Sequence, residues 1–154
     1  MTLGEEPKPF VASEFNERAA AFSPNGRWVA YISNRSGRTE VYTTSYPEPG
    51  APISISTSGG TEPAWSPAGG ELFFRSGNAM MVVPVRLEPE LRIGTPELLF
   101  EGPYVGGPYY RNYDVTRDGQ RFVMVKSEAE ASTARIHVVL NWREELEQLA
   151  PSRR

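Results

Sequence analysis

The stretch AFSPNGRWVAYIS, residues 21–33, returns twice further along the chain. Residues 64–76 (AWSPAGGELFFRS) and 114–126 (DVTRDGQRFVMVK) align with it without a gap. Each copy has an apolar residue, a hydroxyl-bearing residue, a short turn closing on glycine, and then an apolar run. Proline presets φ for such turns, and glycine adopts the positive φ that they often require. The stretch therefore predicts a strand, a tight turn and a second strand, three times over.

The spacing of the copies predicts the fold. Their hydroxyl residues Ser23, Ser66 and Thr116 lie roughly forty to fifty residues apart, and repeats of about forty residues with several strands are typical of β-propellers. We therefore expect one all-β domain, 1–154, made of three four-stranded antiparallel blades, a half-propeller. Its repeats should cover about 7–46, 52–86 and 96–141. The strands expected are 7–12, 19–22, 28–33, 39–46, 53–57, 63–65, 71–75, 79–86, 97–100, 113–116, 121–126 and 135–140.

The two ends of the chain carry separate expectations. Residues 7–12 contain two prolines, which confine a strand to a sheet edge, so this segment should be a spare outer strand. A short helix is expected over 142–149, because Asn141 can cap it and Glu144 occupies the capping-box position.

Composition limits the possible partners and compartments. The chain has 154 residues, a net charge of −3 and no cysteine. This balance offers no overall basic surface for nucleic acid, and it excludes disulfides and cysteine metal sites. The polar N-terminus has no apolar core typical of a signal peptide, and no segment approaches a membrane span. We expect no membrane partner and a cytoplasmic chain as it stands; whether it is a piece of a longer protein stays open.

Three segments resemble a known repeat family. Residues 22–31 (FSPNGRWVAY), 36–42 (SGRTEVY) and 59–66 (GGTEPAWS) are similar to the TolB-like (WD40-like) β-propeller repeat. The tail 138–146 (VVLNWREEL) also resembles the C-terminal propeller of bacterial Ser/Thr protein kinases. The resemblance covers roughly 7–149 and departs from the usual Ser-Pro-Asp-Gly turn at Asn25 and Ala68. The resemblance implies a six-bladed ring. It also implies one of two roles known for such propellers, which bind partner proteins or gate prolyl-oligopeptidase-type active sites.

Motifs for catalysis are missing from the sequence. No phosphate-binding loop, kinase catalytic loop or Gly-x-Ser-x-Gly elbow is present. The single histidine, His137, lies in an expected strand, and without cysteine a transition-metal site would depend on carboxylates. We expect no enzymatic activity, no cofactor and no metal.

Three groups of residues are candidates for binding. The first would form a polar rim at the axial channel, or would merely solvate the channel mouth: Glu62 and Asn112. The second would be a charged cluster on the top face, or a solvated loop with weak surface pairs: Arg35, Arg38 and Glu40. The third has the composition of a binding hot spot, or would pack between blades: Tyr104, Tyr109, Tyr110 and Arg111.

The expected function is that of a non-catalytic scaffold for protein interaction or ligand sensing. Because propellers have at least about four blades, three blades predict a homodimer that closes a six-bladed ring. Otherwise the end faces, with Trp28, Tyr31 and Phe122, would lie uncovered. Two alternatives remain open: a gating or accessory propeller derived from a prolyl-oligopeptidase-type hydrolase or a kinase, and an inert structural fragment.

Overall fold

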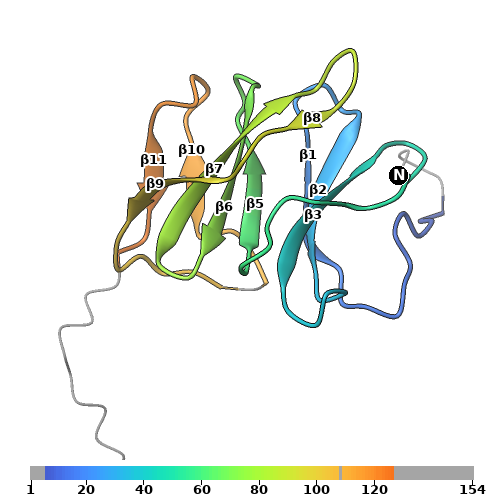
Figure 1. The fold of residues 1–154 in the computed structure, drawn as a ribbon, viewed down its shortest axis with the longest axis horizontal. Coiled ribbons are helices and arrows are strands. Elements are labelled where there is room, and N and C mark those ends of the chain that lie inside the picture. Colours follow the sequence, from blue (N-terminus) through green and yellow to red (C-terminus); the bar gives the residue numbers. More distant parts are fainter. Residues whose placement is uncertain (1–5, 108, 127–154) are drawn as a thin grey trace, which may run out of the picture.

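The protein is all-β over the residues that the computed structural model describes, 6–107 and 109–126. Its strands form three antiparallel sheets, none of which closes on itself. The sheets follow one another along the molecule in chain order, from right to left in Figure 1. The first sheet has the order β1-β2-β3-β4, with β1 Arg18–Phe22, β2 Trp28–Ser33, β3 Glu40–Ser45 and β4 Ile53–Ser54.

The second sheet has five strands, and the third has two. In the second, β5 Thr61–Trp65, β6 Glu71–Ser76 and β7 Ala79–Arg86 are consecutive neighbours. Both β8 Arg92–Ile93 and β9 Glu97–Glu101 pair with β7. The third sheet consists of β10 Tyr113–Val115 and β11 Phe122–Met124. Strands expected from the sequence are thus present in all three sheets, although β4 and β11 are shorter than expected.

Two expectations about local structure are wrong. Residues 7–12 form no strand. Their two prolines lack donors, and no neighbouring strand pairs with them, so the segment runs beside the first sheet with the Phe10 ring 5.4 Å from that of Tyr46. No strand was expected between 86 and 97, yet this connection contains the short strand β8. The strand 135–140, with His137, and the helix 142–149 lie outside the described residues.

The three repeat turns have the same backbone hydrogen bonds. In the first, Gly26 N–H donates to the Ser23 carbonyl at 2.9 Å, and Ser23 N–H donates to the Trp28 carbonyl at 2.9 Å. The second and third turns repeat both bonds with lengths of 2.8 to 2.9 Å. Their closing glycines all have positive φ: Gly26 +68°, Gly69 +79° and Gly119 +72°. The repeat and the conformation of its glycines are therefore confirmed.

Two apolar layers hold the three sheets together. Between the first and second sheets, Ala30 and Ile32 of β2 meet Leu72 and Phe74 of β6. Between the second and third, the Phe73 ring lies 4.9 Å from that of Phe122. Burial of one such phenylalanine stabilises the fold by about 1.5–3 kcal/mol. Successive residues of β6 thus face opposite neighbours, as the two-residue period of a strand requires.

The end of the first sheet is less open than expected. Tyr31 is buried, and Trp28 and Phe122 are half-buried, so these three residues do not form an uncovered patch. Tyr31 is covered by the N-terminal segment, which passes over this face and lines a cavity there with Phe10 and Val11 (Figure 1). Trp28 instead packs against the core between the first two sheets, and Phe122 packs against Phe73 of the second sheet.

Candidate functional site

A groove lies between β1, β5 and the loop that leads into β10. Its volume is about 700 Å³. Its floor consists of β1 residues 19–22 together with Glu62 and Pro63 of β5. Small alanine side chains leave this space open. The opposite wall is formed by Tyr109, Tyr110, Arg111, Tyr113 and Asp114.

A bulge in β5 determines where Glu62 points. β1 and β5 each contain an irregularity at the same repeat position. There Ala19 has φ +52° and Glu62 has φ +54°. Non-glycine residues seldom adopt this region, and bulges commonly re-aim a side chain. The two positions have the same backbone conformation, but only β5 carries a carboxylate side chain there.

The Glu62 carboxylate holds the loop 107–112 from below. It is only 1% exposed. It accepts hydrogen bonds from the backbone N–H of Gly107 at 2.6 Å and of Asn112 at 2.7 Å, and from Asn112 Nδ2 at 3.4 Å. Such charge-assisted bonds are stronger than neutral ones. The structure therefore brings Glu62 and Asn112 into direct contact, beneath the loop rather than at an open rim.

Tyr113 anchors the same loop where it enters β10. Its hydroxyl donates to the Glu62 carbonyl at 2.7 Å. Burial raises the pKa of Tyr113 above its ordinary value, and the nearby Arg111 guanidinium opposes this shift. The phenol therefore stays protonated, and able to donate, throughout the neutral range.

The exposed wall of the groove is aromatic and basic. Tyr109 and Tyr110 are 64% and 69% exposed. The Arg18 guanidinium of β1 lies 4.7 Å from the centre of the Tyr109 ring, a cation–π contact between β1 and the loop. Arg111 pairs with Asp114 at 3.1 Å and remains exposed. These three loop residues are accessible, as a binding surface requires; the sequence reading had overlooked Arg18.

Tyr104 belongs to a different environment from the other two tyrosines. Its ring packs 5.9 Å from that of Phe100, and its carbonyl accepts a bond from Arg75 Nη2 at 3.4 Å. Tyr104 therefore fits the packing interpretation, whereas Tyr109 and Tyr110 fit the binding interpretation.

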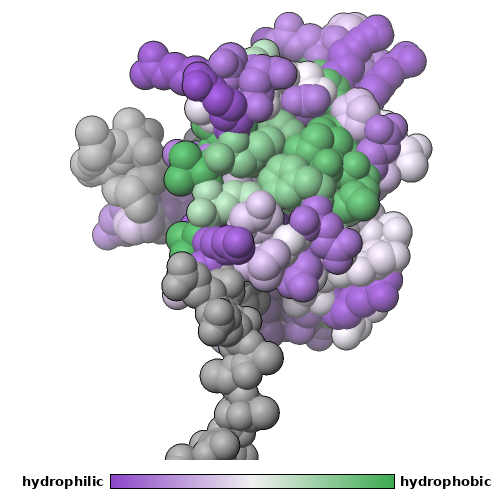
Figure 2. Space-filling model, turned by 90° about the vertical axis from the view of Figure 1, so that its left-hand side faces the viewer, coloured by the Kyte–Doolittle hydropathy of each residue, from purple (hydrophilic) through white to green (hydrophobic). Residues whose placement is uncertain are grey.

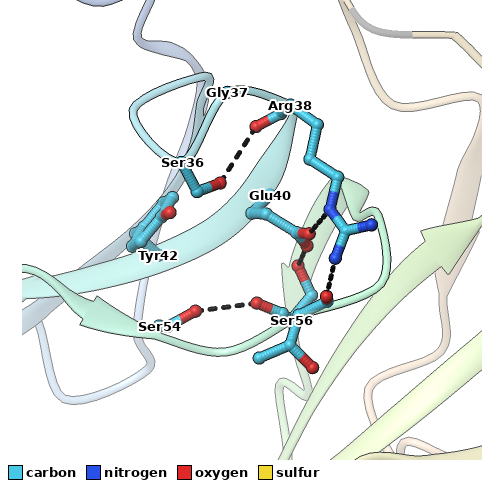
Figure 3. Close-up of a pocket in the computed structure, with 8 residues that line it drawn as sticks. Ser36, Gly37, Arg38, Glu40, Tyr42, Ser54 and Ser56 are labelled. Carbon is cyan, nitrogen blue, oxygen red and sulfur yellow. Dashed lines mark hydrogen bonds and ion pairs between the residues drawn. The ribbon is translucent and has the colours of Figure 1, made fainter.

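The charged cluster of the first repeat forms a clamp around the connection to the second sheet. Glu40, buried at the start of β3, accepts bonds from Arg38 Nε at 2.6 Å, from Gly59 N–H at 2.9 Å and from the Ser56 hydroxyl. Arg38 also donates to the Thr57 carbonyl. Figure 3 shows Glu40 between Arg38 and Ser56, with a bond to each, beside an open pocket of about 450 Å³.

Arg35 does not join this clamp. Its guanidinium lies 5.5 Å from the centre of the Phe15 ring and 5.6 Å from that of Tyr42. The second candidate group is therefore divided, with Arg38 and Glu40 together and Arg35 stacked on aromatic rings nearby.

Arg75 is a buried charge that sequence reasoning missed. It is 1% exposed, and Nη2 donates to the Gly77 carbonyl at 2.9 Å. Its Nε and Nη1 have no hydrogen-bond partner among the described residues. The only signal in the sequence is an arginine at the repeat position where the first copy has Ile32.

The described residues contain neither a candidate metal cluster nor a helix that could span a membrane. Within 6–107 and 109–126, no cluster of three or more His, Cys, Asp or Glu side chains could hold a metal ion. No helix in this part of the chain is long and apolar enough to cross a membrane. In comparisons with known proteins, no family model matches the chain and no curated protein is significantly similar to it.

Proposed function

We propose that this chain is a half-propeller of three blades and acts as a non-catalytic scaffold that binds a protein segment in the groove beside β1 and β5. The observation that carries the proposal is the exposed pair Tyr109 and Tyr110 on a loop held by a buried carboxylate. Tyrosine and arginine are enriched among residues that dominate binding energy. A loop held in place before binding loses less entropy on association.

The chemistry of the groove favours an extended segment with aromatic or acidic side chains. β1 and β5 are both edge strands, and an extended peptide can add to such an edge through main-chain hydrogen bonds. Arg18 and Arg111 flank the tyrosines and would attract carboxylates. Aromatic side chains would find room above the alanines of β1.

The finer architecture belongs to the same proposal. The two-stranded third sheet corresponds to the start of a third blade, with 135–140 as its next strand and 142–149 as a terminal helix. Three blades are fewer than a propeller ring requires, so a second copy would complete a six-bladed ring.

The binding proposal is tested with a random peptide display library panned on the purified full chain. Peptides that are enriched should bind Tyr110→Ala and Arg111→Ala at least about tenfold more weakly, which corresponds to about 1.4 kcal/mol. Arg117→Ala, an exposed arginine on the third repeat turn, is the matched control and should leave binding unchanged. Failure to enrich peptides, or equal affinity for all variants, would contradict the proposal.

A further inference from the structure

One end of the molecule carries an exposed apolar face. The equivalent face is covered in the other two repeats. The second strand of each repeat presents alternate side chains to the next sheet. In the first two repeats these side chains are all buried: Ala30, Ile32, Phe73 and Arg75. The corresponding residues of the third repeat are Val123 of β11 and Val125 just after it, which are 71% and 57% exposed.

This face forms a continuous patch. Figure 2 views the end of the molecule formed by β9 and β11 and shows an apolar area with a hydrophilic rim. Leu98 and Leu99 of β9 are also exposed at their side chains. Contiguous apolar patches with polar rims commonly mark interaction sites. The repeat therefore predicts that another sheet of the same kind covers Val123 and Val125.

The opposite end carries the complementary position. Side chains of the second strand that face the preceding sheet are packed against it in the second and third repeats: Leu72, Phe74, Phe122 and Met124. In the first repeat the corresponding residues are Val29 and Tyr31. They line a cavity of about 210 Å³ together with Phe10, Val11 and Ala20.

The N-terminal segment does not fully occupy this position. The cavity remains beneath Phe10 and Val11, and the buried Tyr31 hydroxyl has no hydrogen-bond partner among the described residues. In the second repeat, Phe74 at the same position as Tyr31 is covered by the first sheet. The first sheet thus has the surface that receives a preceding sheet, filled here by a loosely packed segment.

We propose that these two ends bind each other between two copies of the chain. The β11 face of one copy, with Val123 and Val125, docks on the β2 face of its partner, and the reverse contact forms at the same time. The occupant is a second copy because this pair of positions already packs twice within each chain. Docking displaces Phe10 and Val11. The inference depends on the proposed half-propeller, since two copies joined by unlike surfaces close a ring only when the rotation per copy is half a turn.

The mass of the full chain in solution is the first test. Analytical ultracentrifugation at micromolar concentration should give a dimer. Val123→Glu should give a monomer that retains the far-ultraviolet circular dichroism of the parent. Ile53→Glu is the matched control, because Ile53 is an exposed apolar residue on β4 away from both faces, and it should stay dimeric.

Introduced thiols test which surfaces meet. The chain has no cysteine, so Val123→Cys and Ala20→Cys each supply a single thiol. Under mild oxidation, disulfide-linked dimers should form when the two variants are mixed and not when either is alone. Strong cross-linking of Val123→Cys with itself would show that like faces meet, which overturns the proposal.

The remaining outcomes also decide the matter. A folded monomer whose thermal midpoint falls in Val123→Glu would mean that residues of the same chain beyond 126 cover the patch. Oligomers that grow steadily with concentration would mean that the ends bind without closing a ring. Either result overturns the proposal. Groove binding is measured separately with the enriched peptides, so loss of the dimer and loss of peptide binding are distinguishable.

Discussion

In each repeat turn, the residue two positions after the hydroxyl residue decides whether that hydroxyl has a hydrogen-bond acceptor. In the first turn, the Ser23 hydroxyl donates to Asn25 Oδ1 at 2.8 Å, and in the third, Thr116 donates to Asp118. Ala68 stands at this position in the second turn, and the buried Ser66 hydroxyl has no hydrogen-bond partner among the described residues. The Thr116 bond also lowers the pKa of Asp118, which keeps that acceptor ionised.

Restoring the missing acceptor should stabilise the protein. Ala68 is exposed, so the larger side chain of Ala68→Asn has room. We expect the free energy of unfolding to rise by about 0.5–1.5 kcal/mol, the net value of one hydrogen bond, as measured by urea denaturation. The gain should disappear when Ser66→Ala is combined with it. A gain that survives this second substitution would show that the Ser66 hydroxyl is not the cause.

Substitutions at two turn glycines can distinguish the cost of backbone strain from the cost of steric contact. Gly26 and Gly119 have similar positive φ, but a Cβ at Gly26 would meet nothing within 4 Å, whereas one at Gly119 would lie 2.7 Å from Ser66 Oγ. Gly26→Ala should cost about 1–2 kcal/mol of stability from the left-handed conformation alone. Gly119→Ala should cost more, and the shift in thermal midpoint measures both. Equal shifts would mean that Ser66 moves aside freely.

At the scale of elements, a buried carboxylate supports each connection between sheets. Glu40 binds the backbone of Gly59 on the way to β5, and Glu62 binds that of Gly107 and Asn112 on the way to β10. The two glutamates come from different strands, β3 and β5. The carboxylates that hold the two connections thus come from different places in the repeat.

Neutralising Glu62 should loosen the loop 107–112. Glu62→Gln retains the size but replaces one acceptor oxygen with an amide that donates, leaving N–H groups of Gly107 or Asn112 without a partner. We expect a loss of about 1–3 kcal/mol and faster hydrogen exchange at these two amides. Glu97→Gln, at an exposed position of β9, should change neither. Unchanged exchange in Glu62→Gln would show that the loop is held by Tyr113 alone.

For the whole molecule, the proposed contact between the two unlike ends predicts that thermal stability depends on protein concentration. If the dimer forms through Val123 and Val125, only the folded state binds the partner, so the thermal midpoint rises with protein concentration. Calorimetry over a hundredfold concentration range should show this rise for the parent chain. It should be absent in Val123→Glu. A midpoint independent of concentration in the parent would contradict a dimer held by these faces.

The all-β class, the position of nearly every described strand from 18 to 126, and the positive φ of the turn glycines could be predicted from the amino-acid sequence. These features depend on bonds within one short stretch, such as those between Ser23 and Trp28, and local bonds are readable from local residues. The tertiary structure alone decided that residues 7–12 cover a sheet without pairing, because pairing depends on a neighbouring edge that no local pattern reveals.

The same distinction separates the candidate residues. The exposure of the tyrosine and arginine side chains in 109–111 could be expected from the sequence, because exposure follows from a polar, turn-rich loop. The role of Glu62 could not, because its partners Gly107 and Asn112 lie 45 and 50 residues away and meet it only when the second and third sheets pack. Burial of Arg75 likewise results from that packing: the same strand position is Ile32 in the first repeat, and only the neighbouring sheet determines whether a charge there is covered.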